Sequence, residues 1–300
     1  MKIGITGGSG FIGSHVAESL KKQHDVSIFD LNEPKTEGVE FVKGDILDLE
    51  SVKKSLKNCE VVIHLAAFLG VGRSESDPIT TLDFNISGTR NVIEAAKENN
   101  VKKIIFSSSS EVYGEPVAVP ISESNTPMPI TTYGISKLAG EEYVKSYGKM
   151  YGIEYTIVRL FNVYGFGQSD QFVIPEFIKS ALTGETLKIH GSGSQIRSFC
   201  HVSDVCNAMN LILKEGNGQI FNIGNNIEPI SIKILADKIV SLSKSNSKIE
   251  AIPFTEAHRG RNVEILHRIP DISKAGKILS YQPAISLEEG LKEIIEKTNH

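Results

Sequence analysis

The chain has 300 residues, of which 40% are hydrophobic and 23% are charged, and its formal net charge is −4 at pH 7. This composition is typical of a globular protein with a sizeable core, and the mild acidity argues against bulk binding of nucleic acid. Its three cysteines (Cys59, Cys200, Cys206) have the spacing of neither a disulfide framework nor a zinc site. We expect reduced thiols, no metal, and a cytoplasmic protein without a nucleic-acid or membrane partner, because we recognise neither a signal peptide nor a membrane span.

In the first half of the chain, short β-branched runs alternate with amphipathic segments. Strands are predicted over 2–6, 25–30, 39–43, 60–65, 102–107 and 153–160, and helices over 11–22, 78–99 and 133–150. Buried strands that alternate with helices favour parallel β-α-β units. The fold class predicted is therefore α/β, with a Rossmann-type doubly wound parallel sheet.

The pattern loosens after about Asn162, where glycines mark loops and the predicted elements become shorter. These elements cover residues 202–214, 219–223 and 231–243. We expect a first domain over residues 1–165 and a smaller lobe over 166–300, with some later segments returning to the first domain.

A glycine-rich turn, Gly7-Gly8-Ser9-Gly10-Phe11-Ile12-Gly13, joins the first predicted strand to the first helix. Glycines at this spacing allow a tight turn, close approach of backbone to a pyrophosphate and close helix packing, and the helix amino terminus favours phosphate. The next strand ends at Asp30, where a carboxylate can bind the adenosine ribose, and no adjacent arginine is present to hold a 2′-phosphate. The turn predicts NAD rather than NADP; the alternative is an ordinary turn followed by a solvated aspartate.

Tyr133 and Lys137 are one helical turn apart and share a face of the predicted helix. A nearby ammonium lowers the pKa of a phenol, as a nicotinamide cation also would, so Tyr133 could take a proton while hydride leaves the same carbon. Lys137 could also hold the nicotinamide ribose. The run from Ser107 to Ser110 follows a predicted strand, at the edge where open α/β sheets bind ligands. Alone, such a Tyr–Lys pair would indicate only a half-buried tyrosine beside a surface lysine; the order of the three motifs predicts an oxidoreductase site.

With these motifs, the chain resembles the extended short-chain dehydrogenase/reductase family, the NAD-dependent nucleotide-sugar epimerases and dehydratases. The further matching segments are Asp45-Ile46, His64-Leu65-Ala66-Ala67, Asn85-Ile86-Ser87-Gly88-Thr89, Arg159 to Gly165 and Arg197 to Asp204. The resemblance implies an NAD-binding domain over 1–165 and a lobe over 166–300 that mainly binds a nucleotide-diphosphate sugar. It also implies a homodimer packed through the helices near 78–99 and 133–150.

The resemblance implies residue roles at the matching positions. The catalytic residues would be Ser109, Tyr133 as the base, Lys137 as its helper and, in some members, Glu111. The cofactor would contact Gly7, Gly10, Phe11, Ile12, Gly13, Asp30, Asp45, Ile46, Leu65, Ala66, Ala67, Asn85, Ser107, Tyr133 and Lys137. The substrate would contact Ser109, Ser110, Tyr133, Asn162, Arg197 and Arg268, with the Arg197 guanidinium on the diphosphate.

In this family a 4-keto sugar usually forms first, and a few residues decide how that intermediate reacts. Simple 4-epimerases often lack the glutamate of Ser109-Ser110-Glu111, and Ser110 replaces the aspartate of dTDP-glucose dehydratases. The triplet and Arg268 resemble UDP-glucuronate decarboxylases, although many epimerase-like members also carry Ser-Ser-Glu and the loop at 70–73 does not match the decarboxylases. Glu111 could alternatively serve only to order its loop.

We therefore place 4-epimerisation of a UDP-hexose first, decarboxylation of UDP-glucuronate second and 4,6-dehydration third. The alternative of another class is a non-catalytic NAD(H)-binding regulator, against which the intact Ser109, Tyr133 and Lys137 argue. Arg261 and Arg268 could each reach a phosphate, a carboxylate or neither, and the histidines at positions 190, 201, 258 and 267 are expected to be structural.

Overall fold

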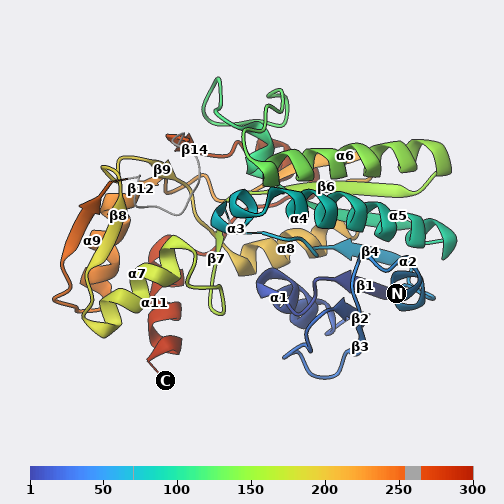
Figure 1. Cartoon of the computed structure of the whole chain (residues 1–300), viewed down its shortest axis with the longest axis horizontal. Coiled ribbons are helices and arrows are strands. Elements are labelled where there is room, and N and C mark those ends of the chain that lie inside the picture. Colours follow the sequence, from blue (N-terminus) through green and yellow to red (C-terminus); the bar gives the residue numbers. More distant parts are fainter. Residues whose placement is uncertain (70, 254–264, 300) are drawn as a thin grey trace.

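The computed structural model describes residues 1–69, 71–253 and 265–299. Its centre is a seven-stranded sheet in which every neighbouring pair of strands is parallel (Figure 1). In spatial order the strands are β11 (Gln219–Ile223), β6 (Glu154–Leu160), β5 (Lys103–Ser109), β4 (Val61–His64), β1 (Lys2–Thr6), β2 (Asp25–Asp30) and β3 (Glu40–Lys43). Strand order reverses between β1 and β4, which is where a doubly wound sheet opens a crevice for ligands.

Helices cover both faces of this sheet, as expected for buried parallel strands. One face packs against α1 (Phe11–Leu20), α8 (Val202–Ile212) and α10 (Ser273–Leu279), and the other against α2 (Leu49–Ser55), α5 (Gly88–Glu98) and α6 (Thr132–Tyr151). The two apolar layers meet the sheet through fully buried side chains such as Ile3 and Ile105 on one face and Val62 and Phe106 on the other. This arrangement confirms the predicted doubly wound α/β fold.

The single helix predicted over 78–99 is three consecutive elements. These are α4 (Pro78–Leu82), a π-helical turn at Asp83–Ser87 and α5. The π-turn contains the buried Asn85, and widened turns of this kind frequently occur at functional sites. A helix α3 (Val71–Ser76) precedes α4, and a 3-10 helix, Ser110–Tyr113, directly follows β5.

A third apolar cluster lies under a smaller lobe, at the left of Figure 1. The lobe contains α7 (Val173–Thr183), α9 (Ile232–Leu242), α11 (Leu287–Thr298), β8 (Leu187–His190) and β13 (Ile249–Ile252). Short strands border it: β7 (Val163–Tyr164), β9 (Ile196–Arg197), β10 (Cys200–His201), β12 (Ile230–Ser231) and β14 (His267–Arg268). Two later segments join the first half of the chain, since β11 pairs with β6 and α8 packs on α1. The boundary at residue 165 stays a prediction.

Within the described ranges, no helix combines the length with the apolar composition that crossing a bilayer requires.

Candidate active site

The glycine-rich turn between β1 and α1 is held too tightly for side chains at two of its glycines. Gly7 has a φ of +74°, and a Cβ there would lie 2.5 Å from the backbone nitrogen of Ala66. A Cβ at Gly13 would lie 2.1 Å from the carbonyl oxygen of Gly7. Gly10 is the N-cap of α1 and has no side chain with which to cap it. The start of α1 is therefore a backbone cradle suited to the phosphates of a dinucleotide.

Asp30 ends β2 beside this turn, as predicted. Its Oδ2 accepts a hydrogen bond from the backbone N–H of Ser9 at 3.0 Å, and its Oδ1 accepts one from Asn32 at 3.0 Å. These bonds fix the carboxylate against the glycine turn, and each oxygen keeps a lone pair that could accept from a ribose hydroxyl. The geometry fits the predicted ribose contact.

Asp45 and Ile46 form a turn shortly after β3. Asp45 Oδ1 accepts from the N–H of Leu47 at 2.9 Å, and Ile46 is buried. Asn91 of α5 donates through Nδ2 to the carbonyl oxygens of Ile46 and Leu47, both at 3.0 Å. These hydrogen bonds anchor the turn to α5. The turn follows β3, which pairs with β2, the strand that carries Asp30.

Leu65, Ala66 and Ala67 follow β4, and the backbone of Leu65 and Ala66 lies against Gly7. The next residue, Phe68, donates its N–H to Asn85 Oδ1 at 2.7 Å, while Asn85 Nδ2 donates to the Phe68 carbonyl at 3.1 Å and to Ser136 Oγ at 2.9 Å. The Asn85 amide is thus engaged in joining this loop to α6. Its predicted contact with the cofactor stays a prediction.

Tyr133, Lys137 and Ser107 are brought together where α6 crosses the end of β5. The Nζ of Lys137 donates to the Ser107 carbonyl at 2.8 Å and lies 5.7 Å from the centre of the Tyr133 ring. Lys137 is 3% exposed, so its charge is almost fully removed from water. Ser109 lies two residues along β5 from Ser107, and its Oγ accepts from the Glu111 N–H at 3.2 Å.

Burial is the largest influence on the pKa values of Lys137 and Tyr133. It lowers the pKa of Lys137 to about 7, against the raising effect of the Glu141 carboxylate. Burial, together with the negative charge of Glu111, raises the pKa of Tyr133 above its usual range. The sequence predicted that the Lys137 ammonium lowers the pKa of Tyr133, whereas in the structure that pKa is raised. The reason is that burial of Tyr133 outweighs the effect of a lysine that is only partly charged at neutral pH.

Glu111 forms a largely buried ion pair with Arg268. Its Oε1 lies 2.7 Å from Arg268 Nη1, and its Oε2 accepts from Thr131 Oγ1 at 3.2 Å. Burial of the Glu111 carboxyl opposes ionisation, but the charge and hydrogen bond of Arg268, aided by Thr131 and Arg197, lower its pKa overall. Arg197 and Arg268 lie side by side, in register on the parallel strands β9 and β14.

Arg268 retains one unused donor. Within the part of the chain that the structure describes, no acceptor lies within hydrogen-bonding distance of its buried Nε. The sequence named Glu111 and Arg268 separately but did not predict that these two distant positions pair. Their pairing follows from β14 returning to the edge of the site beside β9.

The remaining predicted substrate residues are either buried or hydrogen-bonded to backbone carbonyls of the chain. Ser110 is 3% exposed, beneath the surface of the site. Asn162, in the left-handed conformation with φ +37°, donates through Nδ2 to the Ser198 carbonyl at 3.0 Å, and Arg197 Nη1 donates to the Ile196 carbonyl at 2.9 Å. Gly70 of the 70–73 loop, and His258 and Arg261, lie outside the described residues.

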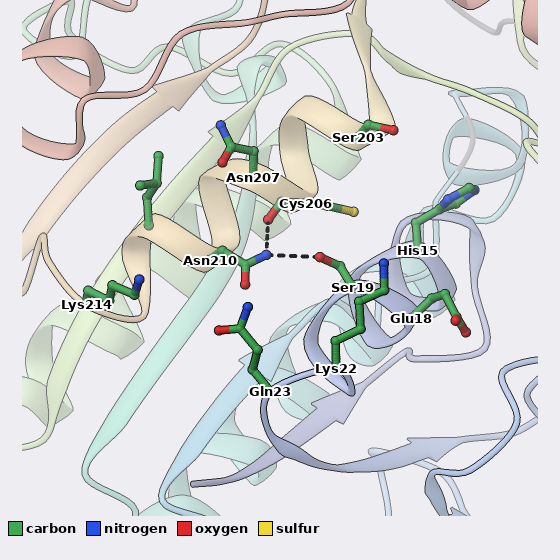
Figure 2. Close-up of a pocket in the computed structure, with 11 residues that line it drawn as sticks. His15, Glu18, Ser19, Lys22, Gln23, Ser203, Cys206, Asn207, Asn210 and Lys214 are labelled. Atoms are coloured by element: carbon green, nitrogen blue, oxygen red, sulfur yellow. Dashed lines mark hydrogen bonds between the residues drawn. The ribbon is translucent and has the colours of Figure 1, made fainter.

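A surface groove of about 560 Å³ lies between α1 and α8, away from these residues (Figure 2). Asn210 bridges the two helices there, donating to Ser19 Oγ at 3.0 Å. None of the predicted site residues lines this groove. In the described ranges there is also no group of three or more histidine, cysteine, aspartate or glutamate side chains that could hold a metal ion.

Known proteins match this chain over most or nearly all of its length. The family described as "NAD dependent epimerase/dehydratase family" matches residues 3–224. A UDP-N-acetyl-alpha-D-glucosaminuronate decarboxylase of Bacillus cytotoxicus is 39% identical over 97% of this chain and 96% of its own. A putative UDP-glucose 4-epimerase of Methanocaldococcus jannaschii is also 39% identical, over 97% of this chain and 96% of its own.

Among solved structures, the Thermotoga maritima UDP-glucose 4-epimerase with UDP-glucose has a TM-score of 0.93 at 34% identity, covering 100% of this chain and 99% of that chain. MoeE5 in complex with UDP-glucuronic acid and NAD has a TM-score of 0.92 at 30% identity, with the same coverage. The glycine cradle, the carboxylate of Asp30 and the Tyr133–Lys137 pair are the geometry that an NAD-dependent enzyme of this kind needs. The chain belongs to the NAD-dependent epimerase/dehydratase family, and it is an NAD-dependent enzyme of the nucleotide-sugar epimerase and dehydratase class.

Proposed function

We propose that this enzyme acts on a UDP-linked hexuronate, oxidising C4 of the sugar and releasing the C6 carboxyl group as carbon dioxide. The observation that carries the proposal is the Glu111–Arg268 ion pair with its unused, buried Arg268 Nε. Arg268 and Arg197 together place two guanidinium groups beside one carboxylate. Arg268 is largely buried, its Nε has no acceptor among the described residues, and a guanidinium suits a carboxylate.

The roles we propose for the chain's own residues follow from their positions. Tyr133 takes the proton of O4, and Lys137 stabilises the resulting phenolate and holds the nicotinamide ribose. The glycine turn and Asp30 would hold NAD, which when bound would supply the hydride acceptor and donor for C4. The Ser109 hydroxyl lies at the end of the same strand as Ser107 and would hydrogen-bond O4. Arg197 would bind the diphosphate.

Oxidation at C4 makes the C6 carboxylate a β-keto acid. The C5–C6 bond then breaks, its electrons move into the C4 enolate, and carbon dioxide leaves. A proton from water is then added at C5, which restores the C4 ketone that hydride reduces. Arg268 would orient the carboxylate through the guanidinium N–H groups that Glu111 leaves unused. Because Glu111 already holds one side of Arg268, the guanidinium does not fully neutralise the substrate carboxylate. The bound carboxylate is therefore stabilised less strongly before the reaction. Strong stabilisation of that carboxylate would raise the barrier to its loss as carbon dioxide.

The second candidate is 4-epimerisation of a UDP-hexose, the reaction that the sequence alone placed first. Its support is the likeness to the T. maritima epimerase structure and to the M. jannaschii relative. We place it second because an uncharged hexose offers no anion to the Arg268 guanidinium. We place 4,6-dehydration third, because Ser110 occupies the position of the aspartate expected in dTDP-glucose dehydratases.

Product analysis tests the proposal. The purified enzyme with NAD is incubated with UDP-glucuronate, UDP-N-acetylglucosaminuronate, UDP-glucose and UDP-galactose, and products are identified by NMR and mass spectrometry. We expect at least one uronate to lose the mass of carbon dioxide and give a UDP-pentose. Turnover of the neutral hexoses alone, or a uronate product of unchanged mass, would contradict the proposal.

A variant isolates the role of Arg268. Arg268→Met should lower kcat/KM for the uronate by about 10²-fold or more, the loss expected for a charge-assisted contact to substrate, while NAD binding is kept. Lys188→Met, which removes an exposed cation of the same lobe, is the matched control and should leave kcat/KM unchanged. Equal activity of Arg268→Met and the control would remove the basis for a carboxylated substrate.

We further propose that the enzyme is a cytoplasmic homodimer. The three cysteines are free and buried, as suits a reducing compartment. Exposed apolar side chains lie on the two helices that the family resemblance implicates, Ile79 of α4 at 72% exposure and Ile135 of α6 at 45%.

A further inference from the structure

A buried ion pair between Glu141 and Arg159 lies one helical turn from Lys137 of the proposed catalytic residues. Glu141 of α6 is 0% exposed and accepts two hydrogen bonds from Arg159 of β6, Nε to Oε1 at 2.8 Å and Nη2 to Oε2 at 2.6 Å. Ser108 of β5 donates to the same carboxylate at 2.6 Å. Burying two charges costs free energy even when they pair well, so such a pair is weak evidence for stability alone.

The pair extends into a hydrogen-bonded row across the sheet. Strand register places Ser108, Arg159 and Asn222 side by side on β5, β6 and β11. Arg159 Nη1 donates to Tyr113 Oη at 2.9 Å, and Tyr113 Oη donates to Asn222 Oδ1 at 2.7 Å. Tyr113 lies two residues after Glu111, so the row reaches from α6 to the 3-10 helix that carries Glu111.

Glu141 also lies one helical turn beyond Lys137, on the same face of α6. The titratable side chains that face Lys137 include Tyr133 and Glu141 of its own helix, His64 of β4 and, through Glu141, Arg159 of β6. Burial lowers the pKa of His64 to about 3, so this histidine is neutral near neutral pH. Glu141 is therefore the group whose negative charge favours the protonated form of Lys137.

We propose that the Glu141–Arg159 pair is a positioning device for the active site, which favours the charged form of Lys137 beside Tyr133 and holds the carboxyl end of β5 against α6. Ser107 and Ser108 are held by neighbouring turns of one helix, the first through Lys137 and the second through Glu141. Ser109 and Glu111 follow directly. The inference rests on the proposed roles of Tyr133 and Lys137, and neither Glu141 nor Arg159 touches substrate.

The direct test is an NMR titration of the Lys137 amine, with lysine labelled at Cε and Nζ and the signal assigned by its absence from Lys137→Met. In Glu141→Gln we expect the titration midpoint to fall by about one pH unit or more, because the favourable charge is gone and Arg159 is left unpaired. The alkaline limb of the kcat profile should move to lower pH with it. Glu142→Gln, the next residue of the helix and an exposed partner of Lys145, is the matched control and should titrate as the wild type does.

A second variant separates charge from folding. Glu141→Met with Arg159→Met removes both charges and keeps an apolar filling, an exchange that buried ion pairs often tolerate. We expect this double variant to fold, with the Lys137 midpoint still lowered and kcat at neutral pH reduced by about tenfold or more while KM changes little. A Lys137 midpoint equal to the wild-type value in both Glu141→Gln and the double variant would overturn the inference. An active Tyr133→Phe would instead refute the proposed function and leave the titration result standing.

Discussion

At the scale of single residues, the site is governed by desolvation as much as by charge. Lys137 is almost fully buried with a pKa of about 7, and Tyr133 has a raised pKa. A phenol in this state does not ionise unaided at neutral pH. The proposed reaction therefore needs Lys137 to be protonated and a positively charged nicotinamide ring to be bound at the same time, so that proton and hydride transfer are coupled to cofactor loading.

Replacing Tyr133 by phenylalanine removes the proposed base and keeps the ring. We expect kcat to fall by about 10²- to 10⁴-fold, the usual range for loss of a general base, with NAD affinity within a few-fold of the wild type. Turnover and NAD binding by fluorescence titration are the two measurements. Tyr143→Phe makes the same change further along α6 and should keep full activity. A Tyr133→Phe enzyme as active as Tyr143→Phe would show that the proton is taken elsewhere.

Which residues surround the site could be predicted from motifs, but how they pair could not. Ser107, Tyr133 and Lys137 follow from local spacing on one strand and one helix, and the structure brings them together. The Glu111–Arg268 contact depends on β14 lying beside β9, which no local pattern encodes. Glu141 and Arg159 were not named as site residues because a buried ion pair leaves no periodic signal in the sequence.

At the scale of elements, the join between β1 and α1 is the most constrained part of the fold. Gly7 and Gly13 cannot carry a Cβ there. A Cβ on Gly7 would meet the backbone of the turn after β4, and one on Gly13, in the first turn of α1, would meet the Gly7 carbonyl. The contact atoms are backbone, which cannot rotate away as a side chain can.

Gly13→Ala should therefore destabilise the protein by about 2–4 kcal/mol and weaken NAD binding, because the new methyl group must displace the Gly7 carbonyl. Thermal and denaturant unfolding give the stability, and fluorescence titration gives the NAD affinity. Gly276→Ala, inside α10 with only the Tyr281 carbonyl oxygen at 3.5 Å, should be neutral or stabilising by up to about 1 kcal/mol. Similar stabilities for the two variants would mean that the turn is not as tight as described.

The strands of the first half could be predicted to within two residues because they are buried, β-branched and bounded by turn residues. Five helices of the described residues were not predicted: α2, α3, α7, α10 and α11. α2 has only two buried positions in seven residues, too few for a periodic signal. α7 has a proline, Pro175, within its first turn, which obscures the helical pattern of its apolar residues. The division of 78–99 was also missed, since the π-turn follows from the placement of Asn85 between the Phe68 loop and α6, a tertiary contact.

At the scale of the whole molecule, the sheet supplies the proposed cofactor residues and the smaller lobe supplies the arginines. Arg197 and Arg268 reach the site from strands β9 and β14 at the border of the lobe (Figure 1). Helices α4 and α6 contact each other, and Ile79 of α4 and Ile135 of α6 are exposed. Apolar residues on neighbouring helices are suited to pack against a second copy of the chain.

Ile79→Asp combined with Ile135→Asp should convert the proposed dimer into a monomer, because a symmetric interface would bury each carboxylate twice. Light scattering after gel filtration should give twice the chain mass of 32.8 kDa for the wild type and a single chain mass for the variant. Ile227→Asp, which charges an isoleucine of 67% exposure elsewhere, should stay dimeric. A monomeric wild type would contradict the proposal.

The most direct measurement tracks a deuterium label at C4 of UDP-glucuronate or UDP-N-acetylglucosaminuronate through the reaction, using mass spectrometry and NMR of the product. If hydride leaves C4 and returns within one active site while the C6 carboxyl group is lost, the UDP-pentose formed carries the deuterium at C4 and lacks the mass of carbon dioxide. A product that keeps its carboxyl group, or that loses its deuterium to solvent, would contradict the account.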